Sequence, residues 1–201
     1  MPDKRPRRDR ASARVFLNVP YDNSYEPILV GLTAALVALG RVPQLTFQVP
    51  DGGEGRLQRI FSLLKSCRVS IHDLSAVGTP VRFNMPFELG LACAIKAETG
   101  KHDFLILERR RHRLDRHLSD LKGIDPKVHN RTVGGAICAV LEVLDKPSGN
   151  PPLADVRRLY LRMMRLLSPL KKRHGAKNIF NTRVYGELTA FGFEEAKQMG
   201  L

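Results

Sequence analysis

The segment RVSIHDLSAVGTPVRFNMPFELGLACAIKAETGKHDFLILE, residues 68–108, decides the fold. It opens with a short apolar and β-branched run at 68–74, which is typical of a buried strand. A loop follows, then a helical pattern rich in small residues over 86–98, and then a second strand pattern over 103–108. A strand, a helix and a strand at this spacing predict a βαβ unit with two parallel strands.

The rest of the central chain repeats this alternation of strand and helix. The further elements are expected at 14–19 (strand), 26–40 (helix), 42–49 (strand), 56–67 (helix), 127–130 (strand) and 133–144 (helix). Right-handed crossovers place the helices of such a chain on both faces of the sheet. The sequence therefore predicts an α/β fold with a doubly wound parallel sheet of about five strands.

The segments that flank this sheet differ from it in composition. Residues 1–13, MPDKRPRRDRASA, carry charge and almost no apolar side chain, which predicts a disordered basic tail. The Pro, Gly and Ser content of 145–152 predicts a linker. An apolar stripe at helical spacing, with arginines largely off the stripe, predicts a helical basic segment over 153–201. We thus expect a tail, an α/β domain over 14–144, a linker and a helical C-terminal appendage.

The formal net charge of +13 is unevenly distributed along the chain. Residues 1–14 and 109–116 contribute +4 each and residues 153–183 contribute +8, whereas residues 15–108 contribute −1. These basic segments could neutralise phosphates, but no aromatic residues alternate with the arginines as a stacking platform requires. The pattern disfavours sequence-specific nucleic-acid binding and leaves non-specific nucleic-acid contact as an alternative.

The composition is that of a globular chain without a membrane segment. The longest apolar run, at 29–40, is too short to cross a bilayer, and the N-terminus lacks the apolar core of a signal peptide. The cysteines Cys67, Cys93 and Cys138 are isolated, with no CxxC pair and no His at ligand spacing. We therefore expect a cytoplasmic protein with no membrane partner, no disulfide and no metal.

Polar side chains follow the predicted strands. In parallel sheets of this kind, ligands bind outside the carboxyl ends of the strands. Asn18, Tyr21 and Asp22 follow the first strand, and Asp73 ends the third. Asp120 lies in a loop after the fourth strand, where it either reaches the rim of a pocket or remains solvated. This edge is therefore the expected place for a site.

Glu88 lies near the start of the helix predicted over 86–98. Pro86 is tolerated in the first turn of a helix, so we expect Glu88 within that turn, close to the positive end of the helix dipole. An acid there stabilises a helix by about 0.3–1 kcal/mol and needs no further role, which is one interpretation. A capping box is not available, because Met85 stands where Ser or Thr is required. The second interpretation is that Glu88 and Asp73 face one pocket.

The segments FNMPFELGLA and VFLNVPYD, with the strand-end Asp of SIHDLS, resemble the TIR-like and nucleoside 2-deoxyribosyltransferase-like group of flavodoxin-type domains. The transferases carry a Glu-x-Gly-x-Ala segment on the equivalent helix, which Glu88, Gly90 and Ala92 match here. The resemblance covers about residues 14–144. It implies a flavodoxin-type fold and an enzyme that cleaves the N-glycosidic bond of NAD or a nucleotide, which is the substrate and not a cofactor.

The resemblance also implies roles for individual residues. Glu88 would be the nucleophile or the stabiliser of an oxocarbenium-like transition state. Asp73 would be the second catalytic residue and would hold the ribose or the base. Asn18, Tyr21 and Asp22 would line the same pocket. Together with them, we expect Asn84, Met85 and Asp120, from their places along the chain, to bind the substrate. The C-terminal helices would mediate self-association or partner sensing, as in defence-type or signalling proteins, so a homo-oligomer is expected.

Two departures from this group keep other functions open. TIR NAD hydrolases usually place a Trp four residues before the glutamate, where this chain has Asn84, and the chain contains no Trp. The acid that the transferases place shortly before the helix glutamate is absent from 77–87. A nucleotide-binding sensor or scaffold without turnover is therefore the alternative, and a basic nucleic-acid-associated protein is a weaker one.

Overall fold

The computed structural model describes residues 13–49, 53, 55–76, 83–111, 118 and 123–201. Within these residues, five strands form one all-parallel sheet in the order β2-β1-β3-β4-β5. The strands are β1 (Arg14–Asn18), β2 (Val42–Gln44), β3 (Val69–Asp73), β4 (Asp103–Glu108) and β5 (Lys127–Val128). This strand order is the flavodoxin-like one. The predicted α/β fold with a parallel sheet of about five strands is confirmed.

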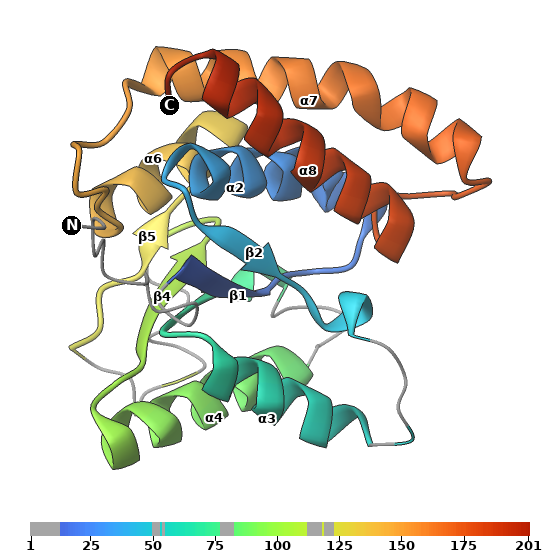
Figure 1. Ribbon diagram of the computed structural model, residues 1–201. Helices are drawn as coiled ribbons and strands as arrows, with labels where there is room; N and C mark the ends of the chain where they lie inside the picture. Colours follow the sequence, from blue (N-terminus) through green and yellow to red (C-terminus); the bar gives the residue numbers. More distant parts are fainter. Residues whose placement is uncertain (1–12, 50–52, 54, 77–82, 112–117, 119–122) are drawn as a thin grey trace, which may run out of the picture.

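Helices cover both faces of the sheet (Figure 1). The face below the sheet in that view carries α3 (Arg56–Ser66) and α4 (Asn84–Thr99). The other face carries α2 (Glu26–Ala38) and α6 (Val133–Val143), and α7 (Leu153–Arg173) and α8 (Thr182–Gln198) form a further layer outside α2. Short 3-10 helices follow the carboxyl ends of β1, β2 and β3, namely η1 (Asn23–Tyr25), η2 (Thr46–Gln48) and η3 (Leu74–Ala76). The predicted helical C-terminal portion is present.

The helix α2 is enclosed by other elements. All of its residues except Pro27 are buried. A helix that is apolar all round must be covered on all sides, and here α6 covers one side while α7 and α8 cover another. The approach of α6 is close, because a Cβ added to Gly31 would lie 2.7 Å from Val133 Cγ1. Among the residues that the structure describes, no helix has the length and apolar character needed to span a membrane.

The largest hydrophobic cluster joins the sheet to the C-terminal helices. It contains Leu17 of β1 and Ile71 of β3 together with Leu159 of α7 and Leu188 of α8. A smaller cluster lies on the opposite face, where Phe16 packs against α3 and α4. The helices beyond 145–152 therefore share one core with the sheet.

The second strand is shorter than predicted. The strand expected over 42–49 ends at Gln44, and Thr46–Gln48 form η2. The N–H of Leu45 donates to Gln48 Oε1 at 2.9 Å, so the chain turns at this point instead of continuing the ladder. As a result, Thr46 lies beyond the carboxyl end of the sheet.

The helix that carries Glu88 begins earlier than predicted. Its first residue is Asn84, so Pro86 is the third helical residue and Glu88 the fifth. The first four N–H groups of a helix have no intrahelical partner, so a proline at the third position loses no bond. The expected place of Glu88 in the first turn is wrong, and the helix-dipole interpretation of this residue loses its basis.

Glu26, at the start of α2, connects this helix to the C-terminal helices. Its Oε2 accepts from Lys171 Nζ at 2.8 Å and its Oε1 accepts from the Ile179 N–H at 2.7 Å. The side chains of Glu26 and Lys171 are only 11% and 25% exposed. This carboxylate therefore satisfies a buried amide and a largely buried ammonium group at once.

We predict that Glu26→Ala lowers the free energy of unfolding by about 3 kcal/mol, because it leaves a buried amide and a largely buried charge without a partner. Urea unfolding followed by circular dichroism measures this loss. The matched control is Glu142→Ala, which removes an exposed ion pair with Lys127. Exposed pairs contribute at most about 1 kcal/mol. Equal losses in the two variants would contradict the prediction.

Candidate functional site

A cavity of about 170 Å³ lies at the carboxyl edge of the sheet. Its described lining comes from the ends of β1 and β2 and from the starts of α3 and α4: Asn18, Val19, Tyr21, Thr46, Arg56, Asn84, Met85 and Glu88. The strand order reverses at β1, and flavodoxin-like sheets bind ligands at this switch point. Pockets that enclose a whole drug-sized ligand have volumes of about 300 Å³ or more. This cavity therefore has room for one ring of a larger ligand.

Glu88 is buried in the wall of this cavity, with 4% of its surface exposed. Burial raises the pKa of its carboxyl group to about 7. The Arg56 guanidinium lies 3.9 Å away and lowers this pKa only in part, because its own side chain is 57% exposed and well solvated. Among the residues that the structure describes, none lies within hydrogen-bond distance of the Glu88 carboxylate as a donor. Glu88 is thus a carboxyl group that changes charge near neutral pH and can bind a ligand.

Asn18 lines the same cavity and is hydrogen-bonded to residues of α4 and β3. Its Nδ2 donates to Met85 O and to His72 Nδ1, each at 3.0 Å. Hydrogen bonds continue from His72 Nε2 to Ser70 Oγ (2.8 Å) and from Ser70 Oγ to His102 Nε2 (2.8 Å). Burial lowers the pKa of His72 to about 3, and it also lowers the pKa of His102. Both imidazoles are therefore neutral at physiological pH.

Tyr21 forms another part of the cavity wall. Burial raises the pKa of its hydroxyl group, and the side chain contacts Thr46. The ring packs against Phe47 and Phe180, with centroid separations of 5.5 and 5.1 Å. Phe180 lies just before α8, and Thr182 Oγ1 donates to Phe47 O at 2.9 Å. The C-terminal portion therefore supports this wall of the cavity from behind.

Asp73 does not belong to this cavity. It is fully buried and is not among the described residues of the lining. Side chains alternate between the two faces of a strand, so His72 faces α3 and α4 with its register partner Asn18, whereas Asp73 faces α2 and α6. The expectation that Asp73 and Glu88 share one pocket is therefore wrong.

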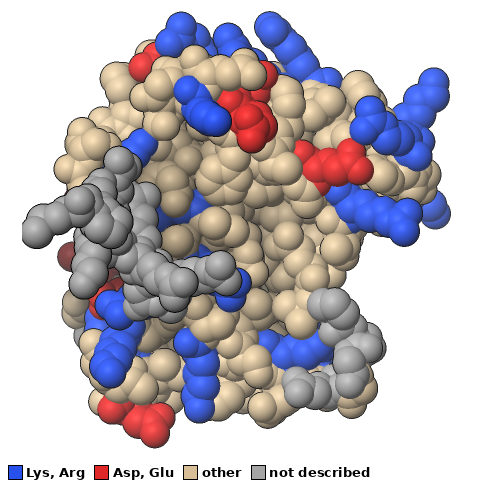
Figure 2. Space-filling model, viewed as in Figure 1, with Lys and Arg blue, Asp and Glu red and all other residues tan. Residues whose placement is uncertain are grey.

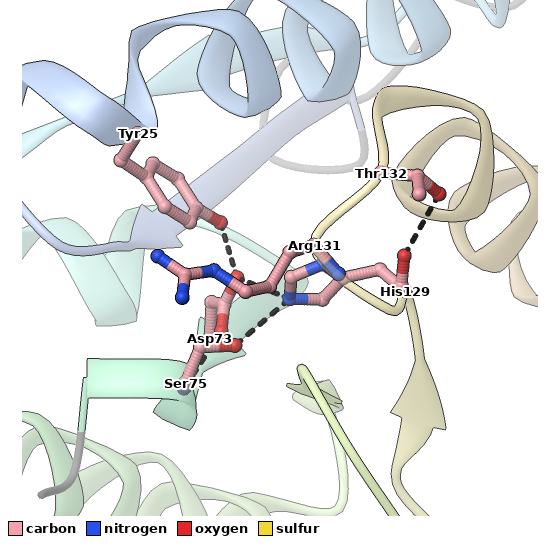
Figure 3. A network of polar contacts seen from close by, with 6 residues as sticks. All are labelled: Tyr25, Asp73, Ser75, His129, Arg131 and Thr132. Atoms are coloured by element: carbon pink, nitrogen blue, oxygen red, sulfur yellow. Dashed lines mark hydrogen bonds and ion pairs between the residues drawn. The ribbon is translucent and has the colours of Figure 1, made fainter.

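Asp73 is the centre of a separate polar network (Figure 3). Its Oδ2 accepts from the Tyr25 hydroxyl group and lies 3.1 Å from His129 Nε2, while its Oδ1 accepts from the Ser75 N–H at 2.8 Å. His129 Nδ1 accepts from the Arg131 N–H at 3.1 Å. The ring proton of a neutral His129 is therefore on Nε2, which also lies 2.8 Å from Ser75 Oγ.

This network is not a nucleophile triad. In a Ser-His-Asp triad, one ring nitrogen faces the carboxylate and the other accepts the proton of the serine. Here His129 Nε2 faces both Asp73 and Ser75, and its Nδ1 is occupied by a backbone N–H. The ring therefore has no free acceptor with which to activate Ser75.

The network instead holds the connection between β5 and α6. Asn130 and Arg131 have left-handed backbone angles, with φ of 52° and 56°, which cost energy in residues other than glycine. Thr132 Oγ1 donates to His129 O at 2.9 Å and accepts from the Gly135 N–H at 3.0 Å (Figure 3 shows the first of these bonds). A Cβ on Gly135 would lie 2.4 Å from His129 O. These contacts keep the strained turn in place.

The other residues predicted from the sequence fall into three groups. Asn84 and Met85 line the cavity with Glu88, as Asn18 and Tyr21 do. Asp22 is exposed and caps η1, its Oδ1 accepting from the Ser24 N–H at 2.8 Å, and it is not among the described lining residues. Asp120 lies outside the described residues.

Sequence reasoning missed Arg56, Thr46 and Val19 in the lining and His129 beside Asp73. The first helical residue after the second strand, Arg56, was identifiable from its place at the carboxyl edge. The strand predicted over 127–130 includes His129, but β5 ends at Val128, so His129 comes directly after the observed strand at the same edge. Thr46 had no such signal, because it falls inside the overlong predicted strand.

The basic residues of 153–183 are partly neutralised within the chain. Arg158, Arg162, Lys171 and Arg173 pair with Asp155, Glu195, Glu26 and Glu187. On the face shown in Figure 2, Lys and Arg side chains are scattered around the rim, with Asp and Glu between those over the C-terminal helices. The tail at 1–12 and most of 109–116 lie outside the described residues. On the face in view, the described basic side chains over the C-terminal helices therefore do not form a continuous stripe, and non-specific nucleic-acid contact stays a prediction.

Comparisons of the chain with protein-family models, curated proteins and solved structures give no match. Within the described part of the chain, no group of three or more His, Cys, Asp or Glu side chains could hold a metal ion. The cavity around Glu88 is therefore the basis for a functional proposal.

We predict that the stability of the chain depends on pH through Glu88. A carboxyl group with a pKa near 4.5 in the unfolded chain and about 7 in the folded one binds its proton more tightly when folded. The free energy of unfolding therefore falls as the pH rises between these two values. Glu88→Gln removes this loss. The free energy of unfolding of the variant, relative to that of wild type, should therefore rise by on the order of 3 kcal/mol between pH 4.5 and pH 8.

Urea unfolding of both proteins at pH 4.5 and pH 8 measures this difference. Glu98→Gln, at an exposed position of the same helix, is the matched control and should follow the wild-type profile. A constant difference between Glu88→Gln and wild type at the two pH values would contradict the prediction.

Proposed function

We propose that this chain cleaves the N-glycosidic bond of NAD or a related nucleotide, with Glu88 as the catalytic carboxylate. The observation that carries the proposal is a carboxyl group that is 4% exposed, with a pKa of about 7, in a cavity at the switch point of the sheet. The sequence resemblance to TIR-like and deoxyribosyltransferase-like domains supports the same reaction.

Cleavage of this bond develops positive charge at the anomeric carbon of the sugar. A carboxylate that is poorly solvated beforehand stabilises this charge, or bonds to the carbon, more strongly than a solvated one. With NAD, the electron pair of the C–N bond passes to the pyridinium nitrogen, and neutral nicotinamide leaves. Water then adds its oxygen to the anomeric carbon and loses a proton, which gives ADP-ribose.

The single carboxyl group in the described lining favours a cationic leaving base. A neutral purine or pyrimidine leaves as an anion unless a second acid protonates it, whereas the pyridinium of NAD needs no proton. Asp73, the other candidate acid, lies on the opposite face of the sheet. This distribution of acids supports NAD as the substrate over a deoxynucleoside.

Arg56 supports a nucleotide as the rest of the ligand. Its side chain is 57% exposed and lies beside Glu88 at the first residue of α3. A guanidinium binds phosphate through two parallel N–H groups, and phosphate contact would draw Arg56 away from Glu88. A bound nucleotide would then place its sugar ring in the cavity and its phosphates toward Arg56.

A nucleotide sensor without turnover is the second candidate function. The ion pair between Arg56 and Glu88 supports it, because a paired carboxylate is a weaker nucleophile. The presence of Asn84 in place of an aromatic side chain in the lining also supports it, because the ring of a bound base has less to stack on. In this function, Glu88 would bind the ligand by accepting hydrogen bonds from the hydroxyl groups of the ligand.

We predict that wild-type protein releases nicotinamide from NAD and that Glu88→Gln lowers kcat/KM by about 10³-fold, because the neutral amide no longer stabilises the developing charge. Chromatographic detection of nicotinamide at high protein concentration measures this. The Glu98→Gln control should retain wild-type activity. Equal release by Glu88→Gln and wild type would contradict the proposal, and binding of NAD by wild type without release would favour the sensor.

We further predict that kcat/KM for NAD rises about tenfold per pH unit below pH 7 and levels off above it, because Glu88 acts in its ionised form. Initial rates between pH 5 and pH 9 give this profile. Activity that falls as the pH rises through 7 would instead identify Glu88 as a proton donor.

A further inference from the structure

Asn18 presents one particular atom to the cavity. A backbone carbonyl group only accepts hydrogen bonds, so the contact with Met85 O at 3.0 Å identifies the NH₂ group of the Asn18 amide. The second hydrogen of Nδ2 is directed at His72 Nδ1, also at 3.0 Å. The Oδ1 atom of Asn18 accepts from no described residue, although the side chain is 95% buried in the cavity wall.

The far end of the hydrogen-bond chain requires the same arrangement. His102 Nδ1 lies 3.0 Å from Cys67 O and must donate to it, so a neutral His102 accepts at Nε2 from the hydroxyl group of Ser70. Ser70 has then donated its only hydrogen, so its oxygen accepts from His72 Nε2. His72 Nδ1 is left as an acceptor, and it accepts from Asn18.

The two ends of this hydrogen-bond chain therefore require the same arrangement of protons. This arrangement requires both imidazoles to be neutral, and burial of His72 and His102 disfavours their charged forms. Protonation of His72 would set its Nδ1–H against the Asn18 NH₂ group, and protonation of His102 would take away the acceptor of the Ser70 hydroxyl hydrogen. Since Nδ2 is used in full, the Asn18 amide cannot turn to offer a donor to a ligand.

We propose that Asn18 is a specificity-determining residue, whose Oδ1 accepts a hydrogen bond from a sugar hydroxyl group and so selects ribosyl ligands over their deoxy counterparts. This inference rests on the proposed function, in which the ring beside Glu88 is the sugar. The cavity of about 170 Å³ holds one ring, and Asn18 and Glu88 line it together. A sugar without the hydroxyl group would leave a buried acceptor unpaired, and such sites strongly reject the deoxy ligand.

Calorimetric titration of the Glu88→Gln protein tests this inference, because binding can then be measured with little turnover. The probes are NAD and two NAD analogues that lack the 2′- or the 3′-hydroxyl group of the nicotinamide-bearing ribose. We expect NAD to bind at least about tenfold more tightly than one analogue. In Glu88→Gln/Asn18→Ala, this preference should fall to about twofold or less. The control Glu88→Gln/Thr46→Ala alters a lining residue outside the hydrogen-bond chain and should keep the preference.

A preference that persists in the Asn18→Ala protein would overturn the inference. An equal loss of affinity for all three ligands would also overturn it, because a merely structural role predicts that result. Absence of NAD binding would overturn the inference together with the proposed function. Binding with the expected preference but without nicotinamide release by wild type would overturn the proposed function alone.

A second measurement needs no variant and does not depend on the folding of Asn18→Ala. Nitrogen-15 NMR of the wild-type imidazoles reports which ring nitrogen carries the proton. We expect the proton of His72 on Nε2 and that of His102 on Nδ1. A proton on Nδ1 of His72 would overturn the inference, because Asn18 Nδ2 could not donate to it.

Discussion

β1 and β3 pair in parallel at the centre of the sheet, with Asn18 opposite His72, and both polar clusters at the carboxyl edge depend on this register. A slip of one residue in a strand turns each of its side chains to the other face of the sheet. The core prevents such a slip. Phe16 fits the cluster formed with α3 and α4, whereas Leu17 and Ile71 fit the cluster on the α2 side. Apolar packing thereby determines which polar groups face Glu88.

The C-terminal helices pack directly against the elements that form the cavity. They cover the outer side of α2, hold Glu26 through Lys171, and place Phe180 against Tyr21. A flavodoxin-like sheet with a helix as apolar as α2 requires such a covering layer. The two additional helices therefore extend the fold, and this sequence also requires them because they cover α2.

The sequence alone was sufficient to predict the parallel sheet and many of the residues that line the cavity. Alternation of strand and helix predicts the fold, and the switch-point rule places Asn18 and Tyr21 at the edge where Glu88 lies. The place of Asp73 was not accessible, because it depends on which face of β3 meets α4. Thr46 was missed because the Gln48 side chain accepts a hydrogen bond from the Leu45 N–H and the strand ends early, and strand propensity does not register such a bond.

Ser70, His72 and His102 are not among the described residues of the cavity lining, yet they determine which atom of Asn18 faces it. His102 precedes β4 at the amino edge of the sheet, and the hydrogen bonds run back along β3 to the opposite edge. In a diverging lineage, one exchange at His102 could alter ligand choice while every residue around the cavity stayed the same. Natural selection on the ligand would therefore act on positions that a comparison of binding sites leaves out.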